Sequence, residues 1–311
     1  MQDTALTVAV LATGGTIAGT AASATDNIGY SAAQLGVQAL VDAVPALHGV
    51  PLLAEQVAQL DSKDMSFAVW AALAQRVAHH LAQPGIAGVV ITHGTDTLEE
   101  TAYLLQRLLA PRKPVVLTAA MRPATSLLRD GPQNLLDAVT LAREPGARGV
   151  MAVLAGTAHS ALEVRKRHSY RLDAFGSGDA GPLAHVEEGR VRRLRDWPAG
   201  EPLGLERIGQ GDWPWVEIVT SHAGARPEAV RALVAAGVRG LVVAGTGNGT
   251  LHHALAAALL DARAAGVSVL RSTRCLAGPV QPTPADRLPS AGGLTPAQAR
   301  VELMLRLMGT A

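Results

Sequence analysis

Two short polar segments carry residue types that suit acyl transfer, and each follows an apolar run. The first reads Thr13-Gly-Gly-Thr16, and the second reads Thr92-His-Gly-Thr-Asp96. A hydroxyl attacks a carbonyl carbon effectively only when a base takes its proton, and a neighbouring carboxylate can hold a substrate ammonium group. Glycines let the backbone bend sharply and let a ligand approach closely. Thr16, Thr95 and Asp96 are therefore the first candidates for chemistry.

Both segments also have simpler interpretations. The first could be only a tight turn: Gly14 and Gly19 have the spacing of a phosphate-binding loop, but Thr20 stands where that loop needs a lysine, and the dinucleotide-binding pattern is not matched. Thr95 and Asp96 could simply cap a helix, since both residue types are common N-caps. His93 has no second ligand at a helical spacing, so we predict no metal site.

The elements that would position these residues alternate between strands and helices. The apolar runs are Leu6–Ala12, Ile86–Thr92, Val115–Ala119 and Val150–Leu154, and the helical patterns are Ala68–Leu81, Thr97–Leu109 and Gln133–Leu141. This alternation predicts an α/β fold with a mainly parallel sheet and helices on both faces. The candidate threonines then lie where strands end and helices begin, which is the usual ligand-binding edge of such sheets.

The chain is predicted to contain two domains. The first covers residues 1–190. Residues 191–213 read as a linker, because the segment Arg190–Pro214 has two Trp-Pro pairs and several glycines and arginines, and Pro and Gly break both periodicities. Residues 214–311 form a smaller α/β domain with a second series of elements: strands Val216–Thr220, Gly240–Ala244 and Val267–Arg271, and helices Pro227–Ala236, Leu251–Ala265 and one from Pro296.

The charge composition of the chain indicates which kinds of binding partner to expect. The 27 Lys and Arg residues nearly balance the 26 Asp and Glu residues, so neither nucleic acid nor an anionic membrane is indicated, and a small neutral or zwitterionic ligand is favoured. The single cysteine, Cys275, is predicted to be a packing residue. No run of eighteen apolar residues is present, and no basic region precedes the first apolar run. We therefore expect a cytoplasmic protein, although a periplasmic chain without its signal peptide would look the same.

The two polar segments, extended to Thr13–Gly19 and Thr92–Tyr103, resemble the two signatures of the bacterial L-asparaginase family, which includes glutaminase-asparaginases. Further similarities follow in the expected order at Thr118–Pro123, Asp130–Asn134 and Gly245–Gly249. The resemblance implies a larger N-terminal flavodoxin-like domain, a smaller C-terminal α/β domain, and a homotetramer built as a dimer of dimers. It implies no metal and no organic cofactor.

The resemblance also assigns roles to individual residues. Thr16 would be the nucleophile, assisted by Tyr30 on a flexible loop, although a lone loop tyrosine is more often a packing or surface residue. Thr95, Lys166 and Asp96 would form a second hydroxyl-lysine-carboxylate cluster. Ser62 and Asp96 would fix the substrate's α-carboxylate and α-amino groups, with a simple turn serine as the alternative for Ser62.

Physical arguments agree with these roles. A lysine amine acts as a base only where burial or nearby positive charge favours its neutral form, and Arg165 and Arg167 flank Lys166; a solvated basic loop is the alternative. The backbone N–H groups of Gly15, Thr16 and Thr95 are candidate donors to a developing oxyanion.

Several other positions complete the predicted site or depart from the family. Ala120 and Asn248 belong to motifs that would contribute to substrate binding, with Asn248 reaching a neighbouring subunit; a turn asparagine is its alternative. Lys63 stands where the family often has an amide or acid that contacts the substrate. The stretch from Cys275 to Arg287 lacks the glutamate that many members carry, and Asp286 is the nearest replacement.

The function expected from all of this is hydrolysis of L-asparagine to L-aspartate and ammonia through an acyl-enzyme on Thr16, with L-glutamine as a possible second substrate. One alternative is a non-catalytic amino-acid-binding or regulatory protein, against which Thr16, Thr95, Asp96 and Lys166 argue together. A tRNA-linked amidotransferase subunit is a second alternative, but it is expected to carry additional N-terminal sequence.

Overall fold

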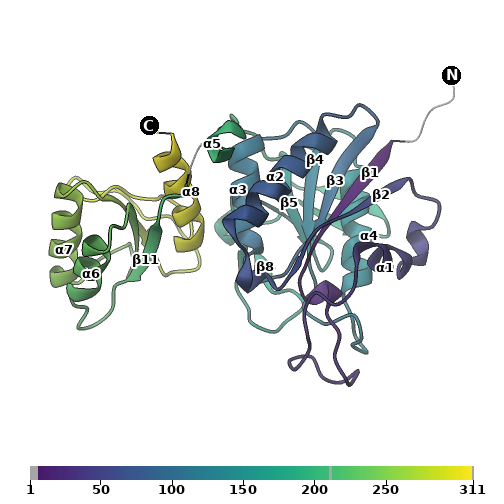
Figure 1. Cartoon of the computed structure of the whole chain (residues 1–311), viewed down its shortest axis with the longest axis horizontal. Helices are drawn as coiled ribbons and strands as arrows, with labels where there is room; N and C mark the ends of the chain where they lie inside the picture. Colours follow the sequence, from purple (N-terminus) through teal and green to yellow (C-terminus); the bar gives the residue numbers. More distant parts are fainter. Residues whose placement is uncertain (1–5, 210–211, 310–311) are drawn as a thin grey trace. The chain divides into compact units, whose positions relative to one another are not determined.

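The computed structural model describes residues 6–209 and 212–309 (Figure 1). The chain divides into two compact units, Met1–Leu205 and Glu206–Ala311, and each is described by itself. None of the helices within the described residues is both long enough and apolar enough to cross a membrane.

The first unit is built on an eight-stranded sheet with the strand order β10-β9-β6-β5-β4-β3-β1-β2. Strands β2, β1, β3, β4 and β5 run parallel, and β6, β9 and β10 continue the sheet in antiparallel pairs. The bounds are β1 Thr7–Gly14, β2 Leu52–Leu60, β3 Ile86–Thr92, β4 Pro114–Thr118, β5 Gly149–Leu154, β6 Thr157–Ser160, β9 Ala184–Glu187 and β10 Arg190–Arg193. A separate two-stranded hairpin joins β7 (Arg165–Lys166) to β8 (Phe175–Gly176).

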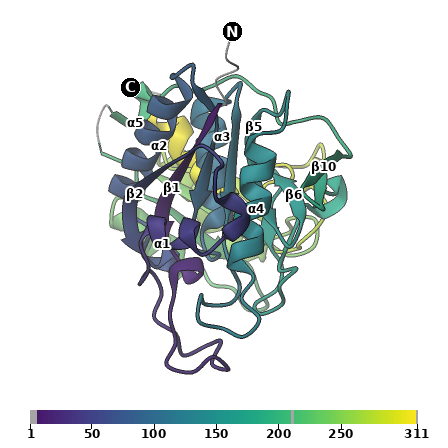
Figure 2. The same ribbon diagram turned by 90° about the vertical axis from the view of Figure 1, so that its right-hand side faces the viewer.

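Helices cover both faces of this sheet, with α1 and α4 on one face and α2 and α3 on the other (Figure 2). Their bounds are α1 Val37–Asp42, α2 Phe67–Leu81, α3 Leu98–Leu109 and α4 Gly131–Ala142. The central strands are buried on both sides, which explains why they read as continuous apolar runs rather than as alternating patterns. On the α4 face, Val10, Val90 and Val116 pack with Leu135 and Ala138.

The second unit holds a three-stranded parallel sheet, β11-β12-β13, with its own apolar core. The strands are β11 Val216–Thr220, β12 Gly240–Gly245 and β13 Ser268–Thr273, and the helices are α5 Glu206–Gly209, α6 Glu228–Ala235, α7 His253–Ala264 and α8 Pro296–Met308. Helix α8 begins with a capping box in which Thr295 and Gln298 satisfy each other's backbone N–H groups.

The predicted α/β class, with a mainly parallel first sheet and a smaller second domain, is confirmed. The structure adds helices and strands that the periodicities did not predict, namely α1, α5, β2 and β6 to β10. Edge strand β2 has a mixed burial pattern, and β7 and β8 have two residues each. Residues 190–193, which the sequence placed mostly in a linker, form β10, because Glu188 and Gly189 adopt positive φ and turn the chain back onto β9.

Candidate active site

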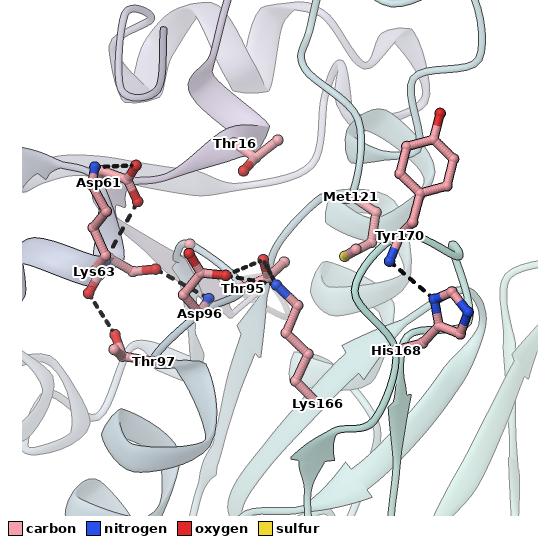
Figure 3. Close-up of polar contacts among 12 residues, drawn as sticks. Thr16, Asp61, Lys63, Thr95, Asp96, Thr97, Met121, Lys166, His168 and Tyr170 are labelled. Atoms are coloured by element: carbon pink, nitrogen blue, oxygen red, sulfur yellow. Dashed lines mark hydrogen bonds and ion pairs between the residues drawn. The ribbon is translucent and has the colours of Figure 1, made fainter. Parts of the chain in front are cut away.

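The two threonine segments meet at the carboxyl ends of neighbouring parallel strands. Thr16 follows β1 and opens a short 3₁₀ helix, Thr16–Ala18, while Thr95 and Asp96 lie between β3 and α3. Since β1 and β3 pair directly, their loops emerge side by side (Figure 3).

Backbone contact between these loops requires glycine. Gly15 has a φ of 82°, and a Cβ added there would lie 2.4 Å from Gly94 Cα. A Cβ on Gly94 would lie 2.4 Å from Ser62 Oγ. The loops after β1, β2 and β3 therefore pack without side chains between them, which brings Thr16, Ser62 and Thr95 to one place.

The Thr16 hydroxyl is buried and lies 2.6 Å from the Tyr30 hydroxyl. Tyr30 comes from residues 20–31, which we call the lid. The ends of the lid are joined by an antiparallel bridge between Thr20 and Ser31. The predicted contact between the Thr16 and Tyr30 hydroxyls is thus present in the structure, and their catalytic roles stay a prediction.

A second segment, residues 124–127, holds the lid, and we call it the latch. Ala21 N donates to Thr125 Oγ1 at 2.9 Å, and Ser126 Oγ donates to Asn27 Oδ1 at 2.7 Å. Two backbone hydrogen bonds add to these, from Ala124 N to Gly19 O and from Leu127 N to Ala24 O. The latch therefore positions Tyr30 through the lid.

Lys166 on β7 reaches both residues of the second cluster. Its Nζ donates to Thr95 Oγ1 at 2.9 Å and to Asp96 Oδ1 at 2.6 Å, as Figure 3 shows. The backbone N–H of Lys166 donates to Glu99 Oε2, which ties β7 to the first turn of α3. The N-cap of α3 is Thr97, so Thr95 and Asp96 do not cap this helix.

Ser62 is buried against the same cluster. Its Oγ accepts the Asp96 N–H at 3.2 Å, and its carbonyl accepts the Thr97 hydroxyl. The ammonium of neighbouring Lys63 pairs with Asp61 and Asp64 at 2.7 and 3.3 Å. Lys63 is therefore held by its own turn, and the substrate contact expected from its position stays a prediction.

Two backbone N–H groups remain for an oxyanion. The Thr16 and Thr95 amides donate to no acceptor among the described residues, and both lie where the loops converge. Gly15 N–H instead donates to Leu60 O at 2.9 Å. The Gly15 amide is therefore not free as the expected third donor, whereas a substrate-binding role for Gly15 stays a prediction.

The loop carrying Ala120 is fixed by two side chains whose roles the sequence did not reveal. Asp130 accepts the N–H groups of Met121 and Arg122 at 2.9 and 3.0 Å, and Asn134 Nδ2 donates to Ala119 O at 2.8 Å. Burial raises the pKa of the Asp130 carboxyl. The signal available in the sequence was the motif that contains both residues, with Asp130 at the N-cap of α4 and Asn134 one turn into the helix.

His93 is a structural residue within the second segment. Burial lowers its pKa to about 4, so the ring is neutral near pH 7. Nδ1 donates to Gly94 O at 2.7 Å, and Nε2 lies 3.0 Å from Thr101 Oγ1, which accepts the Trp70 indole N–H. Within residues 6–209 and 212–309, no cluster of three or more His, Cys, Asp or Glu side chains could hold a metal ion.

The second unit holds the remaining candidates, and both are engaged locally. Asn248 Nδ2 donates to Gln281 O at 3.0 Å, and its Oδ1 accepts Gln281 N–H at 2.7 Å. Asp286 accepts from the Thr283 N–H and hydroxyl and pairs with Arg271; the Thr283 hydrogen bonds, with a smaller contribution from Arg271, lower the pKa of the Asp286 carboxyl. These contacts show how the loop after β13 is held; a contribution to a neighbouring subunit stays a prediction.

One edge of the doubly wound sheet carries a buried hydroxyl, an adjacent hydroxyl-lysine-carboxylate cluster and two unused backbone amides. This combination is typical of the class of nucleophilic acyl-transfer enzymes. Family models agree: "Asparaginase, N-terminal" matches residues 7–198, and "Glutaminase/Asparaginase C-terminal domain" matches residues 215–311. The chain belongs to the asparaginase and glutaminase-asparaginase family.

Individual relatives are similar over nearly the whole chain. L-asparaginase 2 of Escherichia coli strain K12 is 38% identical, over 97% of this chain and 89% of the relative. The glutaminase-asparaginase of Pseudomonas fluorescens biotype A is 36% identical, over 97% and 86%. The crystal structure of a probable cytoplasmic L-asparaginase from Campylobacter jejuni is 38% identical with a TM-score of 0.93, covering 98% of this chain and 96% of that one.

Proposed function

We propose that this protein hydrolyses the side-chain amide of L-asparagine to give L-aspartate and ammonia. The observation that carries the proposal is the 2.6 Å contact between Thr16 Oγ1 and the Tyr30 hydroxyl, at the same strand edge as the Thr95–Lys166–Asp96 cluster. The names of the similar proteins, L-asparaginases and glutaminase-asparaginases, support this substrate class.

In the first half of the reaction, Thr16 Oγ1 attacks the amide carbon and passes its proton to the Tyr30 oxygen, while the phenol releases its own proton to the departing amide nitrogen. The N–H groups of Thr16 and Thr95 receive the developing oxyanion. The carbon–nitrogen bond then breaks, and the leaving amine takes a proton to depart as ammonia. The product of this half is an ester between Thr16 and the aspartyl group.

In the second half, water attacks the ester, and the Thr16 oxygen leaves and regains its proton. Lys166 Nζ, which also pairs with Asp96, donates to Thr95 Oγ1 and so orients that hydroxyl to accept a hydrogen bond from the attacking water, whose proton passes to the leaving Thr16 oxygen. Asp96 keeps the lysine in place through its 2.6 Å contact.

Substrate orientation follows from charge. Asp96 is half exposed at the site and would receive the α-ammonium group, while Ser62 and the nearby backbone would receive the α-carboxylate. L-glutamine differs by one methylene, a difference worth about 1–3 kcal/mol of discrimination in a pocket. We therefore include slower glutamine hydrolysis in the proposal.

Assembly and location belong to the same proposal. We expect a homotetramer, arranged as a dimer of dimers, whose subunits complete one another's sites, to be checked by light scattering. A cytoplasmic location is supported by the name of the Campylobacter jejuni relative, whereas a Haemophilus influenzae relative 36% identical is named as periplasmic. Cell fractionation separates these two locations.

Ammonia release from L-asparagine, L-glutamine and D-asparagine tests the activity. Thr16→Ala should reduce asparagine turnover by at least about 10³-fold while L-aspartate still binds, because the hydroxyl serves the chemistry. Thr140→Ala is the matched control, since its hydroxyl bonds only within α4. Tight asparagine binding by the wild type without ammonia release would instead support a non-catalytic amino-acid-binding protein.

A further inference from the structure

A cavity of about 270 Å³ lies in the first unit between the ends of β5 and β6 and the β7–β8 hairpin. None of the residues assigned above to chemistry or substrate binding lines it. Its volume lies just below the range of about 300–1,000 Å³ that is typical of pockets for drug-sized ligands, so it suits a smaller molecule.

Two buried polar side chains line the cavity. His159 and Ser177 are 4% and 6% exposed, and His159 Nδ1 lies 2.8 Å from Ser177 Oγ. The His159 ring makes this contact through Nδ1, and its Nε2 makes no hydrogen bond with the described residues 6–209 and 212–309. Burial and the positive charges of Arg167, His185 and Arg195 lower the His159 pKa to about 4, so the ring is neutral near pH 7. A buried neutral imidazole with one unused nitrogen can donate to a ligand.

Two opposite charges line the same cavity without neutralising each other. Arg167 and Asp173 make no side-chain hydrogen bond and no ion pair with any described residue. By contrast, neighbouring Arg195 is fully engaged, because it pairs with Glu163 and donates to Gly181 O. The cavity thus presents one available guanidinium and one available carboxylate.

We propose that this cavity is a second ligand site and that it binds a free α-amino acid as its zwitterion. The ligand carboxylate lies against the Arg167 guanidinium and His159 Nε2–H, and the ligand ammonium lies against Asp173. Leu154, Phe175 and Pro182 supply apolar wall for the ligand's side chain.

The site lies next to the catalytic lysine in the chain. Arg167 directly follows Lys166, and its N–H donates to Ala174 O at 2.8 Å, which continues the β7–β8 hairpin. Lys166 is paired in register with Phe175, which lines the cavity. A ligand that restricts the Arg167 side chain therefore also restricts the hairpin that carries Lys166. Binding in the cavity should change the rate of asparagine turnover.

Equilibrium dialysis of radiolabelled L-aspartate against the intact protein tests this proposal. We expect two sites per chain in the wild type. Arg167→Gln and Asp173→Asn should each weaken one of them by about tenfold or more, because each removes a charge-assisted contact. Arg171→Gln and Asp179→Asn are matched controls, since both side chains are exposed and neither lines the cavity.

The outcomes separate this site from the proposed active site. Asp96→Asn should weaken the other site and spare this one. A single site lost with Arg167→Gln but not with Asp96→Asn would support this proposal even if the proposed function failed. A single site lost only with Asp96→Asn, or equal losses in Arg167→Gln and Arg171→Gln, would overturn it. Acetate and methylammonium, each with one charge, should not displace the label.

Thermal unfolding midpoints confirm that each variant is folded, and the exposed Asp173→Asn change keeps the test available if Arg167→Gln is unstable. A saturating non-substrate amino acid such as glycine, which offers the same two charged ends, should alter asparagine turnover in the wild type and not in Arg167→Gln. No kinetic effect in either protein would contradict the coupling to Lys166.

Discussion

The Tyr30 hydroxyl lies 2.6 Å from Thr16 Oγ1, although the two residues are 14 positions apart and no α-helix or β-strand connects them. The contact depends on the lid, which is joined at its ends by the Thr20–Ser31 bridge and held along its length by the latch. The Thr16 and Tyr30 hydroxyls are thus brought together by loops and not by the sheet.

Tyr30→Phe should lower kcat for asparagine by about 10²–10⁴-fold, the usual contribution of a positioned acid or base, with little change in KM. The ring still packs against Gly19, so the lid should keep its conformation. Tyr170→Phe is the control, because Tyr170 is 46% exposed and its hydroxyl makes no hydrogen bond to the described residues. Steady-state kinetics measure both, and an unchanged kcat in Tyr30→Phe would remove Tyr30 from the chemistry.

Ser126→Ala should loosen the lid without touching the reacting atoms. It removes the hydrogen bond to Asn27, and one such bond contributes about 0.5–1.5 kcal/mol, which corresponds to a shift of about two- to tenfold toward open lid conformations. We expect faster proteolysis between residues 20 and 31 and reduced kcat/KM. Ser126→Thr should restore both. Ser169→Ala, at an exposed loop serine, should change neither.

The sequence predicted the sheet core well because central parallel strands such as Ile86–Thr92 are buried on both faces, and the helices that follow them are long and amphipathic. It could not predict β2 or the β7–β8 hairpin, whose pairing depends on partners far away in the chain. The local hydrophobic periodicity of the sequence does not encode such long-range contacts.

The residues of the candidate site also fall into those that the sequence indicated and those that only the structure revealed. Thr16, Thr95 and Asp96 stand out because glycine-rich turns follow strong strands, and Lys166 and Tyr30 required the family resemblance. The use of the Gly15 amide by Leu60, and the pairing of Lys63 with Asp61 and Asp64, depend on three-dimensional contacts that no motif encodes. The role of Asp130 depends on its contacts with the Met121 and Arg122 amides.

The acid stability of the first unit should depend on Glu55. The Arg76 hydrogen bonds lower its pKa from 4.5 to about 2, with a further contribution from His80 at 2.8 Å. Because the folded-state pKa is depressed, this contribution to stability is fully present above about pH 4.5 and is lost as the pH falls through about 2. Glu55→Gln should therefore be less stable than the wild type at pH 7, and the difference should shrink toward pH 2.

Urea unfolding at pH 7, 4 and 2.5 measures that difference in the free energy of unfolding. Glu201→Gln, at an exposed position, should match the wild type throughout. If the difference in unfolding free energy between Glu55→Gln and the wild type stayed constant with pH, packing and not the charge of Glu55 would be the cause of the lower stability.

Asn248→Ala should release the loop after β13, because both polar ends of the Asn248 amide hold the Gln281 backbone. Hydrogen exchange at the Gln281 amide should become faster, while the apolar core around β12 keeps its protection. Asp212→Ala, outside this loop, is the control. Unchanged exchange at Gln281 would show that the loop is held by other contacts.

The same variant tests the proposed sharing of sites between subunits. If the Asn248 loop completes a neighbouring site, Asn248→Ala lowers activity in the folded oligomer, and activity falls on dilution as subunits separate. Mixing inactive Thr16→Ala with Asn248→Ala should then restore part of the turnover, since a mixed dimer contains one site with both residues intact. Subunit exchange is verified separately with differently tagged chains. If subunits exchange and ammonia release does not recover, Asn248 acts only within its own chain, where it holds the loop that contains Gln281.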